Sequence, residues 1–235
     1  CRRLKSRQKE DKYNLRGAAF SSFFSNVSKK ETANEFCSNP LDLMYFSNIS
    51  AHLGESESFS EGVIQELRGI ENIWEPNSRT TNKGFQSKAH VNIFESEATQ
   101  IKRLESIVTS ELDSFYSKFK NITCTLIKEW PANYRLRGWY VILNKFGYQD
   151  LHIHPSGWLS GVIYLKVVPS LKRNEGSIEF GLDSSHYSHI TSPKFVYEPK
   201  LGDIVLFPSS LYHKTIPFTT DAERIIVSFD LKPIM

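Results

Sequence analysis

The order of apolar and polar residues gives one segment a clear helical period. Between Ser96 and Lys120, apolar residues recur every three or four positions, which is the spacing of one face of an α-helix. They are Ile101, Leu104, Ile107, Val108, Leu112, Phe115 and Phe119. The pattern predicts a long amphipathic helix at about 96–120 whose apolar stripe packs against a sheet.

After Asn121 the helical period gives way to short apolar runs broken by Pro and Gly. The runs read TCTLIK, YRLRGWYVILN, SGVIYLKVV, SIEF, KFVY, DIVLF and RIIVSFDL. Many short strands with turn signals between them, and no helical period in between, predict an antiparallel sandwich or barrel.

Residues 1–80 have a different composition, rich in Ser, Asn, Glu and Lys. Apolar clusters at 41–46 and 63–70 predict short helices, and the stretch EPNSRTTNKGFQ at 75–86 predicts a loop. We therefore expect a helical and loop extension over 1–80, and one β-rich domain over 81–235 that includes the long helix. Because the chain begins with Cys1 rather than Met, we also expect a region upstream of it.

Composition narrows the classes of partner. With 29 basic and 26 acidic residues the net charge is only +3, so no broad basic field predicts nucleic acid as a partner. The three cysteines give neither a disulfide framework nor a paired ligand spacing, and no apolar stretch reaches the roughly 18 residues of a membrane helix. We expect a cytoplasmic protein with no membrane partner, and a homodimer stays open.

Two histidines lie two positions apart in the sequence DLHIHP at 150–155. On a strand, side chains at i and i+2 project from one face, so His152 and His154 would present two imidazoles side by side, as metal chelation requires. Taken alone, such a pair is more often a surface or packing feature than a ligand pair.

A third histidine and an arginine follow in the β-rich half. The run PKLGDIVLFPSSLYH at 199–213 predicts a turn, an apolar strand and then His213 on the next strand. Arg224 begins a further strand and shares one of its faces with Ser228. An arginine inside a barrel is a costly buried charge unless it meets an anion such as a dicarboxylate, whereas a surface arginine needs no such partner.

Three segments, in this order and spacing, resemble the Fe(II)/2-oxoglutarate-dependent oxygenase superfamily. They are HIHPSGWLSGVIYL, GDIVLFPSSLYH and AERIIVSFD. The resemblance is strongest to the bacterial and phage branch with an HxHP…SGVYYL signature. It covers about residues 135–231 and extends faintly back to 74–94.

The resemblance implies a mainly β fold, a double-stranded β-helix of the jelly-roll or cupin-like type with supporting N-terminal helices. It also implies Fe(II) and 2-oxoglutarate as cofactors. His152 and His213 match the two histidine ligands of the superfamily, and Arg224 matches the basic residue that binds the far carboxylate of 2-oxoglutarate. Further hydrogen bonds or cavity walls would come from Tyr164, Ser228, Asn144 and Trp139. It implies no catalytic residue beyond the metal ligands.

The chain departs from the superfamily at the third ligand. The usual triad has Asp or Glu two residues after the first histidine, and this chain has His154 there. Three interpretations follow: a three-histidine site, a two-histidine site completed by water, or a carboxylate from Asp150 or Asp183. We favour three histidines, because strand alternation puts His152 and His154 on one face. Iron is the first choice of metal, with nickel, zinc or copper open on ligand type.

The implied activity is hydroxylation of an organic or peptide substrate with O2, releasing succinate and CO2. One alternative is a cupin-like three-histidine dioxygenase that needs no 2-oxoglutarate. Another is a jelly-roll binding module without catalysis, although the joint presence of His152, His213 and Arg224 speaks against it.

Overall fold

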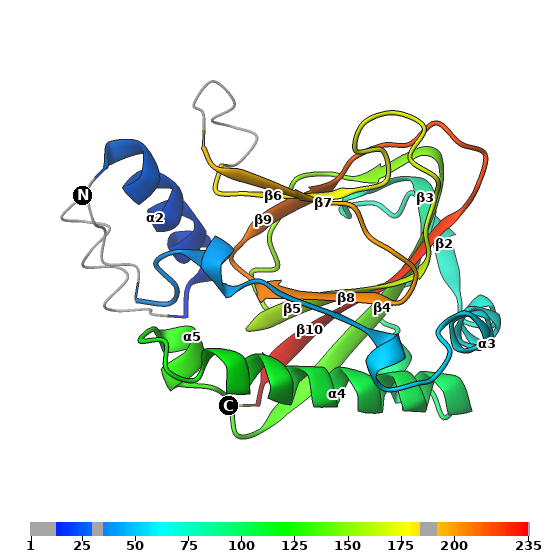
Figure 1. Cartoon of the computed structure of the whole chain (residues 1–235), viewed down its shortest axis with the longest axis horizontal. Coiled ribbons are helices and arrows are strands. Elements are labelled where there is room, and N and C mark those ends of the chain that lie inside the picture. Colours follow the sequence, from blue (N-terminus) through cyan, green and yellow to red (C-terminus); the bar gives the residue numbers. More distant parts are fainter. Residues whose placement is uncertain (1–12, 30–34, 184–191, 235) are drawn as a thin grey trace.

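The computed structural model of the chain describes residues 13–29, 35–183 and 192–234. Two antiparallel sheets face each other in this part of the chain (Figure 1). Along the larger sheet the strands are β1 (Tyr45–Asn48), β8 (Asp203–Pro208), β5 (Leu159–Lys166), β10 (Arg224–Pro233), β4 (Tyr134–Gln149), β3 (Thr81–Ser87) and β2 (Asn72–Trp74). Along the smaller sheet they are β7 (Lys194–Tyr197), β6 (Ile178–Gly181) and β9 (Tyr212–Thr215).

Helices support the larger sheet on the face that points away from the smaller one. In Figure 1, α4 runs along this face, and α3 packs against α4. The helices are α2 (Leu15–Ser28), α3 (Glu57–Arg68), α4 (Thr99–Phe119) and α5 (Thr125–Lys128), with single turns η1 (Pro40–Leu43), η2 (Ile49–Ala51) and η3 (Ile93–Glu95). Among the described residues, no helix combines the length and apolar character that a membrane span requires.

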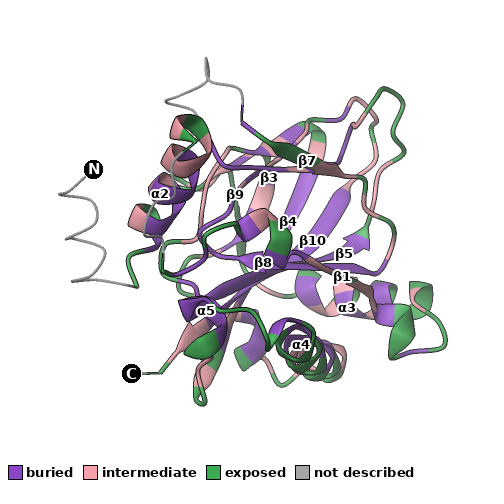
Figure 2. Ribbon diagram, turned by 60° about the vertical axis from the view of Figure 1, so that its left-hand side comes forward, coloured by how far each residue is buried: buried purple, intermediate pink, exposed green. Residues whose placement is uncertain are grey.

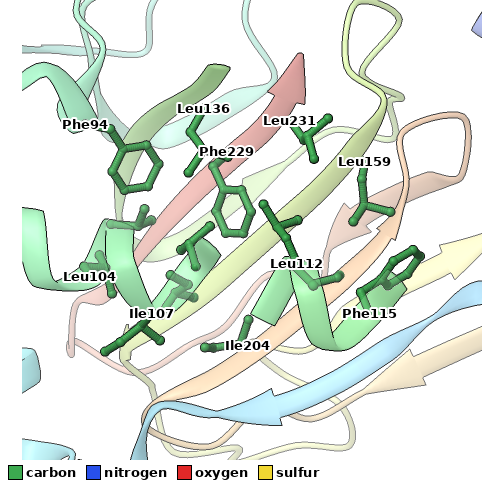
Figure 3. Packing of buried hydrophobic residues seen from close by; sticks show 14 of the residues in the cluster. Phe94, Leu104, Ile107, Leu112, Phe115, Leu136, Leu159, Ile204, Phe229 and Leu231 are labelled. Carbon is green, nitrogen blue, oxygen red and sulfur yellow. The ribbon is translucent and has the colours of Figure 1, made fainter. Parts of the chain in front are cut away.

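The period of two along each central strand divides the core into two layers. On β10, Ile225, Val227 and Phe229 pack toward the helices, whereas Ile226 packs toward the smaller sheet. Figure 3 shows the helix-side layer, where Phe229 and Leu231 face the apolar stripe of α4. Burying each such side chain stabilises the fold by about 1.5–3 kcal/mol. Figure 2 shows buried positions concentrated on the central strands.

The long helix and most of the strands agree with the sequence-based predictions. The predicted helix at 96–120 is α4, the six runs from YRLRGWYVILN onward form β4 to β8 and β10, and the strand expected to carry His213 is β9. The extension before residue 81 is less separate than expected, because β1 and β2 pair with β8 and β3 of the main sheet. The division at residue 80 therefore stays a prediction.

Two predicted segments are wrong. The run TCTLIK was expected as a strand, but Thr125–Lys128 form the helical turn α5, which buries the adjacent residues Leu126 and Ile127 together. A strand would place these two neighbours on opposite faces. The predicted loop at 75–86 contains most of β3, because its Asn-Lys-Gly turn signal is a bulge with Lys83 at φ 48° and a register shift against β4.

Candidate metal centre and cosubstrate cavity

Three histidines meet between the two sheets. His152 follows β4 and exchanges two backbone hydrogen bonds of 3.0 Å with His213 on β9. His154 lies two residues further on, and its ring centroid is 5.0 Å from that of His213. One ring nitrogen from each histidine lies within 4.8 Å of the others, and the described residues contain no other cluster of this kind. The structure thus brings together the three residues that the sequence analysis selected.

The second ring nitrogen of each histidine is held by an oxygen acceptor. His152 Nδ1 lies 2.6 Å from the carbonyl oxygen of Asp150, and His213 Nδ1 lies 3.0 Å from that of Leu211. His154 Nδ1 lies 2.6 Å from Oδ1 of Asp230. A neutral imidazole that donates from Nδ1 keeps its lone pair on Nε2. All three Nε2 atoms are therefore left free as ligands, which is the arrangement that orients metal-binding histidines.

The distance between two of these nitrogens fits a shared cation. Nε2 of His152 and Nε2 of His154 are 3.2 Å apart. Two imidazole nitrogens bound to one metal at about 2.0–2.1 Å and near-tetrahedral or right angles are separated by about 2.8–3.4 Å. Burial, followed by the neighbouring histidines, lowers the pKa of His152 to about 3 and that of His213 well below its ordinary value. Both rings therefore stay neutral, as metal ligation requires.

The structure separates the other proposed ligands from this cluster. The carboxylate of Asp150 accepts a 2.9 Å hydrogen bond from the Asn82 amide, and that of Asp183 accepts one from Ser192. Neither aspartate belongs to the cluster formed by the described residues. The geometry favours three histidines, and their ligation of a metal stays a prediction.

The carboxylate of Asp230 contacts Nδ1 of His154, on the side of the ring away from the free Nε2. The sequence analysis did not predict this contact. Asp230 is 5% exposed, and its Oδ1 accepts a 2.7 Å hydrogen bond from Ser160 as well as the one from His154. The Ser160 hydroxyl also lies 2.7 Å from that of Ser209. The available signal was strand alternation, since Asp230 follows Ser228 by two residues on β10 and lies on the same face.

A narrow cavity leads from the histidines into the barrel and ends at Arg224. Among its lining residues are the three histidines, Trp139, Gln149, Phe207, Thr215, Arg224, Ile226 and Ser228. Arg224 is 1% exposed, its Nε donates to the carbonyl oxygen of Gly176 at 3.1 Å, and its guanidinium lies 5.0 Å from the centre of the Tyr164 ring. Within the described part of the chain, Nη1 of Arg224 and the Tyr164 hydroxyl have no partner in hydrogen-bond geometry, although the two groups lie close enough for each to shift the other's pKa.

These orphaned donors fit a carboxylate. A buried guanidinium without an anion is unfavourable, because burial disfavours its charge. Burial accordingly lowers the pKa of Arg224 and raises the pKa of Tyr164 to about 12, so the phenol stays a donor. A carboxylate at this end of the cavity would accept from both groups.

The remaining predicted residues divide between the cavity and its surroundings. Ser228 and Trp139 line the cavity, and Tyr164 lies against Arg224. Asn144 is not among the lining residues, contrary to expectation. Strand β4 packs Val141 and Leu143 toward the smaller sheet, so the next residue, Asn144, points to the opposite face. Gln149 and Thr215 were missed, although Thr215 follows His213 by two residues on β9.

Comparison with known proteins supports the resemblance found in the sequence. Residues 137–230 match the family described as "Putative 2OG-Fe(II) oxygenase". No curated protein matches the chain.

Solved structures match over most of the chain. A prolyl-4-hydroxylase from Pseudomonas putida is 11% identical with a TM-score of 0.57, over 93% of this chain and 100% of that chain. HygX from Streptomyces hygroscopicus, with nickel, 2-oxoglutarate and hygromycin B, is 14% identical with a TM-score of 0.55, over 82% and 83%. The carbocyclase SnoK from nogalamycin biosynthesis is 12% identical with a TM-score of 0.57, over 81% and 79%. Identities this low carry the fold alone, and that fold is the double-stranded β-helix. Residues 137–230, in the β-rich part of the chain, are thus similar to the 2OG-Fe(II) oxygenase family, and the chain shares its fold with these solved structures.

Proposed function

We propose that the chain is an Fe(II)- and 2-oxoglutarate-dependent oxygenase that hydroxylates an organic or peptide substrate. His152, His154 and His213 would hold the iron through Nε2, and Arg224 would bind the far carboxylate of the cosubstrate. One observation carries the proposal. A single cavity joins three imidazoles with converging free nitrogens to a buried guanidinium, one of whose donors has no hydrogen-bond partner among the described residues.

The residues between these two ends suit a small dicarboxylate. Ser228 and Thr215 offer hydroxyl groups to the cavity, and the Arg224 side chain is fixed by its hydrogen bond to Gly176. Phe207 and Ile226 provide apolar walls that exclude water from the chelating end. A guanidinium fixed in this way binds a carboxylate with little loss of side-chain entropy.

Bound Fe(II) and 2-oxoglutarate together supply the capacity to activate O2 and oxidise a nearby C–H bond, with release of succinate and CO2. Two solved structures with this fold are named prolyl hydroxylases, one of them in complex with a peptide fragment, whereas others are named as a carbocyclase and an epimerase. Hydroxylation is the reaction that we propose among these, with O2 as co-reactant.

The test is anaerobic titration of the full chain with Fe(II) and then 2-oxoglutarate, following the visible metal-to-ligand charge-transfer band. We expect the band in the parent, and its loss or weakening in His213→Ala and Arg224→Ala. The matched controls are His90→Ala and Arg68→Ala, which remove an exposed histidine and an exposed arginine outside the cavity.

The other outcomes refute the proposal in different ways. Iron that binds without a band would favour the three-histidine dioxygenase that does not use 2-oxoglutarate. A parent that binds no iron would favour a binding module or a different metal. Equal loss in the control variants would show that the substitutions act through folding.

A further inference from the structure

A larger cavity opens on the outer side of the histidines. Its volume is about 430 Å³, and both His152 and His154 line it together with Trp139 and Asp230. Cavities of this size hold small organic ligands. If the metal centre is as proposed, a substrate must lie here to reach it, so this inference rests on the proposed function.

The walls of this outer cavity are strongly basic. The basic residues among its lining are Arg16, Arg79, Lys88, Arg137 and Lys232. Lys88 pairs with Glu71 at 2.9 Å, and the described part of the chain places no carboxylate within ion-pair distance of the other four. The only acidic residue in the lining is Asp230, whose carboxylate is buried and already bound to His154.

This charge belongs to the cavity and not to the protein as a whole. The net charge of the whole chain is only +3, because 26 acidic residues balance most of the 29 basic ones. Four cations around one cavity with no carboxylate partner among the described residues are therefore a local excess, although Arg137 also donates to the Ala89 carbonyl and Lys232 to the Ser156 hydroxyl. Burial lowers the pKa of half-buried Lys232, Asp230 raises it, and Arg137, Arg135 and Arg79 lower it again. An anion in the cavity would relieve that repulsion.

The sheet register sets how these groups lie relative to the metal centre. Arg137 on β4 is paired with Asp230 on β10, and Trp139 is paired with Ser228. Lys232 follows Asp230 by two residues on the same face of β10. The basic side chains therefore line the outer cavity next to His152 and His154, and Trp139 lines the same cavity.

From this placement we propose that the substrate is a small molecule with a phosphate or carboxylate group. The anionic group would lie between Arg79, Arg137 and Lys232, and an apolar or ring portion would lie against Trp139 toward the histidines. Arginine forks bind both kinds of anion in bidentate fashion, and lysine adds a point charge.

Calorimetric titration tests this with phenyl phosphate, isophthalate and neutral benzyl alcohol as probes. The protein is the full chain at low ionic strength, metal-free and with Fe(II) and saturating 2-oxoglutarate. We expect at least one anionic probe to bind and benzyl alcohol to bind at least tenfold more weakly. The tighter anion distinguishes phosphate from carboxylate chemistry.

The double variant Arg79→Gln/Lys232→Gln should weaken anion binding at least tenfold. The control Arg68→Gln/Lys145→Gln removes the same charge from residues outside the cavity and should leave binding within twofold of the parent. No binding of either anion, or equal loss in the control, would overturn the proposal. So would an oligonucleotide or a poly-glutamate peptide that binds while the small anions do not.

The outcome is separable from that of the charge-transfer experiment. Anion binding by metal-free protein without any charge-transfer band would refute the proposed function and leave the anion site. A band without anion binding would do the reverse.

Discussion

Asp230 offers the sharpest test of how the metal centre is built. Its carboxylate lies 2.6 Å from Nδ1 of His154 and is 5% exposed, so the contact is a charge-assisted hydrogen bond shielded from water. In the proposed site His154 would stand where the superfamily usually has a carboxylate ligand, and Asp230 would supply negative charge from the far side of the imidazole ring, through its contact with Nδ1. We expect both Asp230→Asn and Asp230→Ala to weaken iron binding, and Asp230→Ala to weaken it more.

The magnitudes follow from what each substitution leaves behind. Removing an outer partner of a metal-bound histidine costs about 10–100-fold in metal affinity, or roughly 1.4–2.7 kcal/mol. Asparagine keeps an oxygen that can accept from His154 and Ser160 and loses only the charge, so we expect about tenfold. Alanine also leaves the Ser160 hydroxyl and His154 Nδ1 without that acceptor, so we expect about a hundredfold.

The assay is anaerobic competition for Fe(II) between the protein and a chromophoric chelator. The matched control is Asp203→Asn, because Asp203 is also buried and hydrogen-bonded, by Tyr197 and the Lys200 amide, but does not line the cavities next to the histidines. Circular dichroism and thermal melting verify that each variant is folded. Parent-like affinity in both Asp230 variants, or equal loss in Asp203→Asn, would refute the role assigned to Asp230.

Three further predictions concern stability and cosubstrate binding. The pKa of His152 in the folded protein is about 3, so between pH 6.5 and pH 3 the unfolded chain binds more protons than the folded one. The free energy of unfolding of the metal-free protein, measured with urea, should therefore fall by about 2 kcal/mol between neutral pH and pH 5 through this group. This loss should be absent in His152→Gln. Glu111→Ala should lower the free energy of unfolding by about 2–4 kcal/mol in the same assay, because buried Glu111 accepts 2.7 Å hydrogen bonds from both Tyr45 and Ser47. A decrease of less than about 0.5 kcal/mol would contradict this. Arg224→Met should leave the stability of ligand-free protein within about 1 kcal/mol or raise it, while abolishing the charge-transfer band. A larger loss would show that the hydrogen bond from Arg224 to Gly176 outweighs the cost of the buried charge, which would refute this reasoning.

Local periodicity was enough to predict an antiparallel sandwich or barrel, whereas the double-stranded β-helix followed from the family resemblance. The apolar period of α4 is strong because this helix is long and packs on one face, and the apolar runs of β5, β8 and β10 are strong because these strands are buried on both faces. The wrong segments lie at 123–128 and 75–86. Their conformations depend on tertiary contacts, such as the backbone hydrogen bonds from Thr125 and Leu126 to residues 35 and 36, which no local pattern reveals.

Sequence spacing predicted only which residues share a face within one strand, and the family resemblance supplied their roles in one site. Arg224 and Ser228 share a face of β10, and that face was expected. Asp230 lies on this face too, but its contact with His154 joins residues that are far apart in the sequence, and spacing within one strand does not predict such a contact. The outer basic residues come from α2, β4, β10 and the loops flanking β3, so only the folded chain shows that they share one cavity.

The inner face of β10 arranges both proposed sites along one line. Arg224, Ser228, Asp230 and Lys232 follow one another on this face, and β10 is hydrogen-bonded to β4 and β5 on both sides. Register is therefore fixed, and the spacing of these groups is set by the strand rise of about 3.3 Å per residue. Lys232 follows Asp230 by about 7 Å, and Asp230 supports His154 directly. If both proposals hold, the oxidised carbon of the substrate lies only a few bonds from its anionic group. Compounds with a phosphate or carboxylate close to the reacting C–H bond should then be turned over faster than longer homologues, and equal rates along such a series would refute the alignment.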